Sequence, residues 1–537
     1  TSAADRRPPW LCRGAPAMSV GASAPSPPVA AGWRDFKRVV GLAAPTMGMY
    51  LLMMAAETIS LIFLGRVPGS TSEEIAGLGL GNLVYNCAAL AVGFGFTSSQ
   101  DTLVTQAFGR GDLELCKLYL YRCQIWLVPV FAASSFVVGS TEPLLLWLGV
   151  ASADTTRHAG VYTRLCIAGL FGTFQYSALR KYTMAVGRPK AGLIVQAISV
   201  PLHAAWCALL VPQYRMFGVG VAMAVKGWTD LILLIVYVRF LMKPREHTHG
   251  WWRFWRALRG ERAWAGMHEY LCLAVPCVAI TAVEWWAWEF LGIFAGYMHS
   301  PDKLAAHVTA INIGSMLYLA GTGAQKAAST LVGQACGRGD ESELRSVSRA
   351  AVQWNICCGT CFGLLVVIFR WQLVKAYNPG NPAIQSKLVD LTPLIATQGF
   401  IDGMNQCIQG MLFGLGMQAE ASKISLFCYW LVMLPLAALL AFPVNLGLEG
   451  LWLGCVLAGL TSVALNIRLL TRIDFASIAQ AAALRMSLDS TRGDCSVGPT
   501  MATSCSLEDF ALPAEATLNP SELRPAVAPD ARAQAPS

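Results

Sequence analysis

Long apolar stretches separated by short polar segments dominate the chain from about residue 39 to residue 470. Each stretch is close to the length of about 20 residues that a helix needs to cross the hydrocarbon core of a bilayer. The pattern therefore predicts about twelve membrane-spanning helices. Their expected ranges are 39–64, 76–97, 119–138, 161–185, 193–211, 219–241, 271–297, 305–331, 352–369, 388–415, 424–444 and 446–470.

The composition supports a membrane protein. Of the 537 residues, 55% are hydrophobic and only 13% are charged, which is unlike a soluble globular chain. The formal net charge of +8 comes from Lys and Arg in short clusters between the apolar stretches, where such residues act as topology signals. The expected fold is an all-α polytopic membrane protein, with the lipid bilayer as a partner and no nucleic acid.

The apolar stretches fall into two sets of six, which predicts five segments. Residues 1–32 and 474–537 are rich in Pro, Ala and Ser and are expected to be disordered, and no cleavable secretory signal is expected in the first. Residues 33–242 and 266–473 are expected to form two lobes of six helices each. Residues 243–265 are expected to form a cytoplasmic linker, because six Lys and Arg are interleaved there with tryptophans. Both termini would then be cytoplasmic.

One segment is repeated almost letter for letter. Residues 102–112 read TLVTQAFGRGD and residues 330–340 read TLVGQACGRGD, and each copy follows the second apolar stretch of its half. A duplicated unit with six spans enters the membrane the same way both times. The two repeats should therefore be related by a pseudo-two-fold axis along the membrane normal, with the functional site between them.

The repeated Gly-Arg-Gly-Asp also has a local interpretation. Gly111 and Gly339 can end a helix in a left-handed conformation, and Asp112 and Asp340 can cap the next helix. Glu343 would complete a capping box with Asp340. We favour this structural role over a substrate contact for the tetrapeptide.

Three of the acidic residues inside the predicted spans are the main candidates for a functional site. A carboxylate at that depth costs about 2.5–3.5 kcal/mol on insertion scales, so such residues usually face a cavity and act there. Glu284, Glu289 and Asp402 could each hold either a proton or a cationic substrate, and that competition would give antiport. Residues five apart are separated by roughly 140° around a helix. We therefore expect Glu284 to act with Asp402 and Glu289 to support them, and a structural hydrogen bond is the alternative role for each.

Several motifs resemble those of one transporter family. Residues 98–109, SSQDTLVTQAFG, resemble the Asp-Thr-Leu-x-x-Gln-Ala-x-Gly signature of eukaryotic multidrug and toxic compound extrusion (MATE) transporters. Residues 284–289, EWWAWE, are similar to an element of animal MATE exporters, and Asp402 occupies the place of an acidic residue of the family. The resemblance covers roughly residues 37–472, and Lys181 matches a basic residue of the fourth helix.

The resemblance and the residue chemistry extend the candidate site. Asn86 coincides with an asparagine of the family's second helix, and Asn312 stands where animal members often have a glutamate. Trp285 could attract an organic cation through its ring face or could lie at a lipid interface. Glu57 could replace an acid that bacterial members carry one turn later, or it could reach the interface. A third role for Glu57 is to pair with a polar neighbour. Lys226 and Asp230 are four apart in one predicted helix and favour an ion pair.

These observations predict a secondary antiporter that works by alternating access. It would export organic cations, xenobiotics or metabolites and take up protons in exchange. A sodium-coupled exporter and a lipid flippase of related fold remain alternatives, and a membrane-embedded enzyme or receptor is the alternative of another class. Nucleotide-binding and metallohydrolase motifs are not found, so no enzyme activity, cofactor or metal is expected. The protein is expected to be a monomer in the plasma membrane or the vacuolar membrane, with a small-molecule substrate and protons or Na⁺ as partners.

Overall fold

A computed structural model describes residues 28–149, 151–242, 264, 266–298, 300–377 and 382–491. Every element within these ranges is a helix. The helices of the first half are α1 (Pro28–Gly65), α2 (Ser72–Tyr85), the π-helical η1 (Asn86–Leu90), α3 (Ala91–Thr97), α4 (Gln100–Arg110), α5 (Leu113–Gly139), α6 (Thr141–Leu148), α7 (Ala153–Ala185) and α8 (Lys190–Leu241). Those of the second half are α11 (Met267–Gly296), α12 (Pro301–Arg338), α13 (Glu341–Ile368), α14 (Arg370–Tyr377), α15 (Pro382–Leu415), α16 (Gln418–Leu426), the π-helical η2 (Phe427–Met433), α17 (Leu434–Ala441), α18 (Gly447–Arg472) and α19 (Phe475–Thr491).

The helices account for the twelve predicted spans. Within the described residues, nine helical segments are long and apolar enough to cross a membrane. One of them, α8, has 52 residues, about 78 Å of helix, and contains a backbone break at Arg215 (φ 50°, ψ −124°), so it supplies two spans. Helices α7 and α15 have 33 and 34 residues but carry more polar side chains, so they are not among the nine. The prediction of two six-helix repeats is confirmed.

The turn after each copy of the repeated segment has the predicted geometry. Gly111 and Gly339 adopt φ values of +85° and +70°, the left-handed region that a residue without Cβ enters at little cost. The Asp112 carboxylate accepts a hydrogen bond from the backbone N–H of Leu115 at 2.9 Å, which caps α5. The Asp340 carboxylate caps α13 in the same way. The local interpretation of Gly-Arg-Gly-Asp as a helix stop and start is therefore confirmed.

The predicted capping box at Asp340 is not formed. The Glu343 carboxylate instead accepts hydrogen bonds from Arg38 at 2.7 Å and from Arg338 at 2.6 Å. A complete capping box is found at the start of α2, between Thr71 and Glu74. Arginine is the stronger partner for a carboxylate because the hydrogen bond is charge-assisted. That competition explains why this part of the prediction is wrong.

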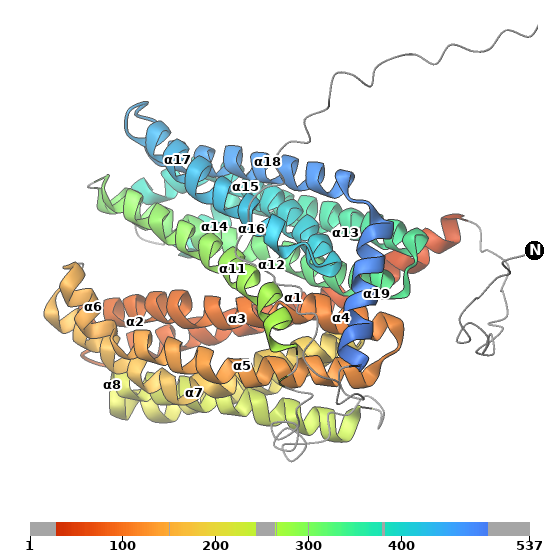
Figure 1. The fold of residues 1–537 in the computed structure, drawn as a ribbon. Helices are drawn as coiled ribbons and strands as arrows, with labels where there is room; N and C mark the ends of the chain where they lie inside the picture. The colour runs from red at the N-terminus through yellow and green to blue at the C-terminus, as the bar shows by residue number, and fades with distance from the viewer. Residues whose placement is uncertain are drawn as a thin grey trace, which may run out of the picture. The chain divides into compact units, whose positions relative to one another are not determined.

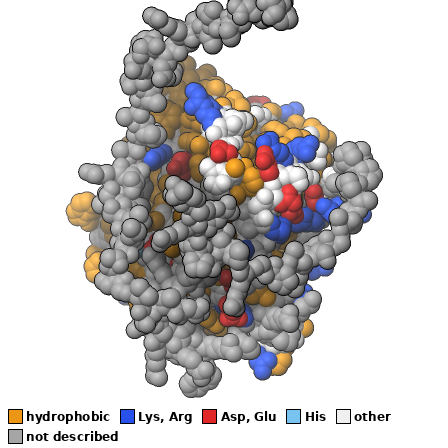
Figure 2. Space-filling model, turned by 45° about the vertical axis from the view of Figure 1, so that its right-hand side comes forward, with side chains coloured by type: hydrophobic (Ala, Val, Ile, Leu, Met, Phe, Trp, Pro, Cys, Tyr) orange, Lys and Arg blue, Asp and Glu red, His pale blue; other side chains and the backbone are white. Residues whose placement is uncertain are grey.

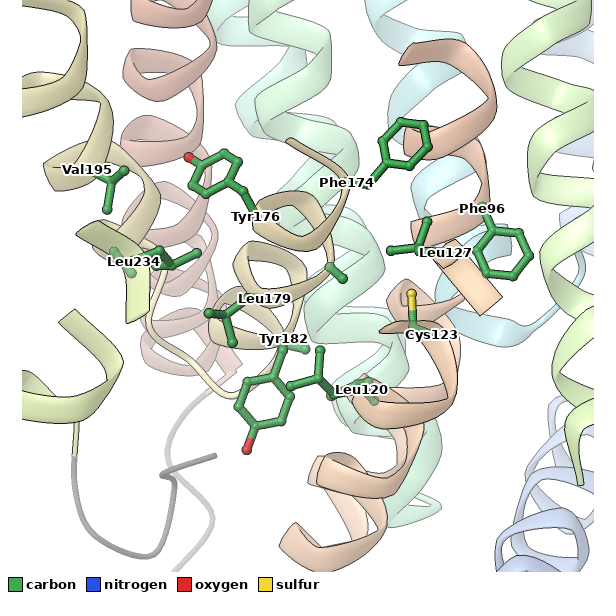
Figure 3. Packing of buried hydrophobic residues seen from close by; sticks show 14 of the residues in the cluster. Phe96, Leu120, Cys123, Leu127, Phe174, Tyr176, Leu179, Tyr182, Val195 and Leu234 are labelled. Carbon is green, nitrogen blue, oxygen red and sulfur yellow. The ribbon is translucent and has the colours of Figure 1, made fainter. Parts of the chain in front are cut away.

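The interior of the first lobe is packed from side chains of many helices, among them α3, α5, α7 and α8. Figure 3 shows Phe96 of α3, Cys123 and Leu127 of α5, and Phe174 of α7 close to one another, with further side chains from α7 and α8 beside them. Cys123 is fully buried and packs as a small hydrophobic side chain. Because lipid is as apolar as this core, close packing rather than water exclusion holds such helices together.

Helix α19 lies within the range 474–537, which the sequence predicts to be disordered, so that prediction is wrong for residues 475–491. Its residues form polar contacts with the first lobe: Arg485 donates to Gln106 at 2.6 Å, and Asp489 accepts from Tyr119 at 2.8 Å and from Arg122 at 3.0 Å. Figure 1 shows α19 running from the end of α18 toward α5. These partners, which are distant in sequence, explain why composition alone did not reveal an ordered helix.

The end of the molecule that carries α19 is polar. Figure 2 brings this end forward, and its described part shows Lys, Arg, Asp and Glu side chains gathered together. Ion pairs at the ends of α1 and α13 include Arg38–Glu343 and Arg345–Glu341. Helix α1 begins at Pro28, inside the segment 1–32 that was expected to be disordered. The basic linker predicted at 243–265 lies outside the described residues except for Trp264.

Candidate functional site

A cavity of about 290 Å³ lies between side chains from both halves of the chain. It is bordered by α1, α2, η1, α3, α7 and α8 of the first half and by α11, α12 and α15 of the second. Its polar lining residues are Tyr50, Glu57, Tyr85, Asn86, Ser98, Thr173, Tyr176, Arg180, Lys181, Lys226, Asp230, Thr281, Glu284, Trp285, Tyr318, Thr322, Gln325, Lys326 and Gln409. This position agrees with a site between two duplicated lobes.

The second lobe contributes a pair of buried acids. Glu284 of α11 lines the cavity and is 7% exposed, and Asp402 of α15 is 6% exposed. The Gln406 side chain donates a hydrogen bond to Asp402 Oδ2 at 3.3 Å. The two carboxyls are close enough to interact electrostatically, and both interact with the Tyr429 side chain. Tyr429 belongs to η2, and π-helical segments of this kind are frequent at functional sites.

The first lobe contributes a second set of charged groups. Glu57 of α1 lines the same cavity. Lys226 Nζ lies 2.7 Å from Asp230 Oδ2 and also donates to Gln196 Oε1 at 3.1 Å. The ion pair predicted from the spacing of Lys226 and Asp230 is therefore present. Both of its members also border the cavity.

The structure brings together most, but not all, of the site residues that were predicted from sequence. Asn86, at the start of η1, and Trp285 line the cavity, and Trp285 packs edge-to-face with Phe94 at 6.5 Å between ring centroids. Glu289 and Asn312 are exposed and do not line it. The Asn312 amide donates to the Val308 carbonyl of its own helix at 3.0 Å.

Sequence reasoning missed a cluster of charges that joins the two lobes. Asp101 of α4 accepts hydrogen bonds on the same oxygen from Lys181 of α7 at 2.8 Å and from Lys326 of α12 at 3.1 Å. Arg180, next to Lys181, also lines the cavity. Arg180 and Lys326 could have been found from sequence, because each is an ionisable residue inside a helix of spanning length and such residues are usually functional.

The two copies of the repeated segment pack against each other beyond this cluster. A methyl group added at Gly109 would collide with the backbone of Gln334, and one added at Gly337 would collide with the backbone of Gln106. The Gln106 side chain donates to the Gly414 carbonyl at 2.9 Å, so it also ties α4 to the second lobe. The repeats thus close one end of the lobe interface through a symmetric pair of glycine contacts.

Comparison with known proteins agrees with this architecture. The MatE family model matches residues 45–209 and again residues 276–439, once in each half. Protein DETOXIFICATION 36 of Arabidopsis thaliana is 24% identical over 460 residues, which is 84% of this chain and 88% of that protein. Multidrug and toxin extrusion protein 2 of Mus musculus is 27% identical over 462 residues, which is 86% of this chain and 78% of that protein.

Solved structures share the fold. The crystal structure of the eukaryotic MATE transporter AtDTX14 superimposes with a TM-score of 0.77 at 21% identity, covering 85% of this chain and all of that one. The two family matches cover more than half of the sequence and coincide with the two lobes. The chain belongs to the MatE family and is an integral membrane transporter of the eukaryotic multidrug and toxin extrusion type.

Proposed function

We propose that this transporter exports organic cations, xenobiotics or metabolites, in exchange for protons by alternating access. The observation that carries the proposal is the buried Glu284 carboxyl, which borders a cavity between the two lobes and has Asp402 beside it. The related mouse protein is named a multidrug and toxin extrusion protein, which supports the same class of cargo.

Competition at Glu284 would couple the two fluxes. As an anion, the carboxyl attracts a positively charged cargo, and the attraction is strong because the surroundings are less polar than water. As a neutral acid, it does not. The ring of Trp285 adds a surface on which an organic cation can lie. A proton that reaches Glu284 would therefore release the cargo, and its loss would restore binding.

The residues around Asp402 would position this carboxyl pair. Gln406 donates to Asp402, and Tyr429 interacts with both acids, so a proton on one of them changes the hydrogen bonds of the other. Glu57 and Asn86 would contact the cargo from the first lobe, because both line the same cavity. Glu289, outside the cavity lining, would have at most a supporting role through α11.

The glycine contacts between α4 and α12 indicate which transport conformation the structure represents. If the basic segments face the cytoplasm, the interface closed by the two repeats lies on the cytoplasmic side, and the cavity would open to the outside. Protons would then enter from outside in this conformation, and separation of the repeats would open the cavity inward. Both termini would be cytoplasmic, in the plasma membrane or the vacuolar membrane.

Transport in proteoliposomes tests the proposal. An imposed pH gradient should drive the cationic dye rhodamine 123 across the membrane, and Glu284→Gln should abolish this movement because the amide cannot exchange a proton. Glu420→Gln, which changes an exposed glutamate of α16, is the matched control and should transport normally. Unchanged transport by Glu284→Gln would overturn the mechanism. Transport driven by a sodium gradient alone would replace the proton with Na⁺.

A further inference from the structure

One end of the cavity holds more positive than negative charge. Arg180, Lys181 and Lys326 line it, and they are only 4%, 5% and 7% exposed. Both lysines direct their ammonium groups to the same oxygen of Asp101. Three buried cations are therefore grouped around one carboxylate.

Arg180 is the cation whose hydrogen bonds are least satisfied. One of its terminal nitrogens donates to the Tyr50 hydroxyl at 3.3 Å, and its guanidinium lies over the rings of Tyr50 at 5.3 Å and Tyr176 at 6.0 Å. Its Nε has no hydrogen-bond partner, and none of the carboxylates in the described parts of the chain forms an ion pair with it. Arg180 interacts electrostatically with Asp101, but this carboxylate is already shared by the two lysines. A buried excess of positive charge is costly, so an anion bound in the cavity would stabilise this group of cations.

We propose that this end of the cavity binds an anionic group of the cargo, a carboxylate or a group of similar charge, and that the preferred cargo is zwitterionic. The inference rests on the proposed function, because it assigns the cargo to the same cavity. The cationic part of the molecule would lie toward Glu284 and Trp285. The anionic part would lie toward Arg180 and Lys326.

The chemistry of the two ends supports this orientation. A guanidinium offers a planar fork of N–H donors that matches a carboxylate, and two aromatic rings hold the Arg180 fork in place. Glu284 interacts electrostatically with Lys326, so the acidic and basic ends lie within reach of one small organic molecule. A purely cationic cargo would leave Arg180 with only the Asp101 carboxylate that it shares with the two lysines.

A pair of dyes that differ in one group provides the test. Rhodamine 110 carries a free carboxylate, and rhodamine 123 is its methyl ester with the same cationic ring system. Binding of both dyes to the purified full-length protein in detergent at neutral pH is measured by fluorescence polarisation, without any ion gradient. The wild-type protein should bind rhodamine 110 at least about tenfold more tightly, which is the order expected for a charge-assisted contact.

Variants then locate the contact. Arg180→Gln should reduce the ratio of the two affinities about tenfold, whereas Arg180→Lys should retain part of it. Arg164→Gln, on the same helix and paired with Glu142 away from the cavity, is the matched control and should leave the ratio unchanged. Lys326→Gln provides a second reading if Arg180→Gln does not fold.

Equal affinities of the wild-type protein for the two dyes would overturn the inference, as would a ratio that survives both Arg180→Gln and Lys326→Gln. These results are separate from a failure of the proposed function, which would appear as absence of pH-driven rhodamine 123 transport. A protein that transports rhodamine 123 but does not favour rhodamine 110 would refute only the zwitterionic cargo.

Discussion

The contact between the two repeated segments offers a direct way to perturb the conformation of the transporter. Gly109 lies against the Gln334 backbone and Gly337 against the Gln106 backbone, so an added methyl group has no free space at either position. Backbone atoms cannot turn aside as a flexible side chain can. Gly109→Ala and Gly337→Ala should therefore push α4 and α12 apart.

The size of the effect follows from two opposing terms. Overpacking a close interface costs about 1–3 kcal/mol. Replacing a helical glycine by alanine returns about 0.5–1 kcal/mol through the lower flexibility of the unfolded chain, but that gain is the same in both transport conformations. The closed interface should therefore lose about 1–3 kcal/mol relative to the open one, a shift of about 5–150-fold in their ratio.

Hydrogen–deuterium exchange measures this shift. Peptides covering α4 and the last turns of α12 should exchange faster in Gly109→Ala than in the wild type. Gly79→Ala is the matched control, because its added methyl group would meet no atom within 4 Å. If Gly109→Ala and Gly79→Ala gave the same exchange in these peptides, the two repeats would not form the contact that we describe.

Three further predictions concern stability. Asp101→Asn should destabilise the protein by about 3–5 kcal/mol because it leaves two buried lysines without their carboxylate. The control Asp154→Asn, at an exposed site, should cost less than about 1 kcal/mol, and unfolding in SDS measures both free energies. Asp489→Asn should release α19, which would be measured as faster hydrogen–deuterium exchange of residues 475–491. Gln480→Ala, at an exposed site of the same helix, is the control, and the same exchange rates in both variants would contradict the role of Asp489. Backbone and side-chain hydrogen bonds lower the pKa of Asp340, so the helix cap stabilises the protein above the ordinary Asp pKa of about 3.9, and this stabilisation is lost as pH falls through the lowered pKa. Asp340→Ala should therefore cost about 0.5–2 kcal/mol of stability at neutral pH and nothing in acid. A cost that does not depend on pH would argue against the cap.

Much of the fold could be predicted from sequence because a bilayer imposes a simple constraint on length and polarity. The most apolar spans, such as the helical segment Gln418–Ala441, can be readily placed from sequence. The break within α8 at Arg215 was also anticipated, since the polar residues around it divide two apolar stretches. The repeated segment indicates the duplication from sequence alone, and the two matches of the family model confirm it.

The parts that sequence did not reveal depend on contacts between residues distant in the chain. Helix α19 is ordered by Tyr119 and Arg122, about 370 residues earlier, and no local pattern records such partners. The repeated segment predicts its own turn and the duplication of the chain. Its packing across the lobe interface depends on the relative position of α4 and α12, which spacing along the chain cannot give.

The candidate site was only partly predictable for the same reason. Glu284 was identified because an acid is costly at lipid depth, and the structure places it at the cavity. The same argument applies to Arg180 and Lys326, but it was applied to acids alone. Glu289 satisfies the sequence criterion equally well and yet points away, because five residues along a helix turn a side chain by roughly 140°.

If a proton and a cationic cargo compete for Glu284, the affinity for the cargo must depend on pH even without transport. We predict that the affinity of the wild-type protein for rhodamine 123 weakens about tenfold for each unit of acidification once Glu284 is protonated, and that Glu284→Gln removes this dependence. An affinity that stays constant with pH in the wild-type protein, or a dependence that persists in Glu284→Gln, would contradict the account.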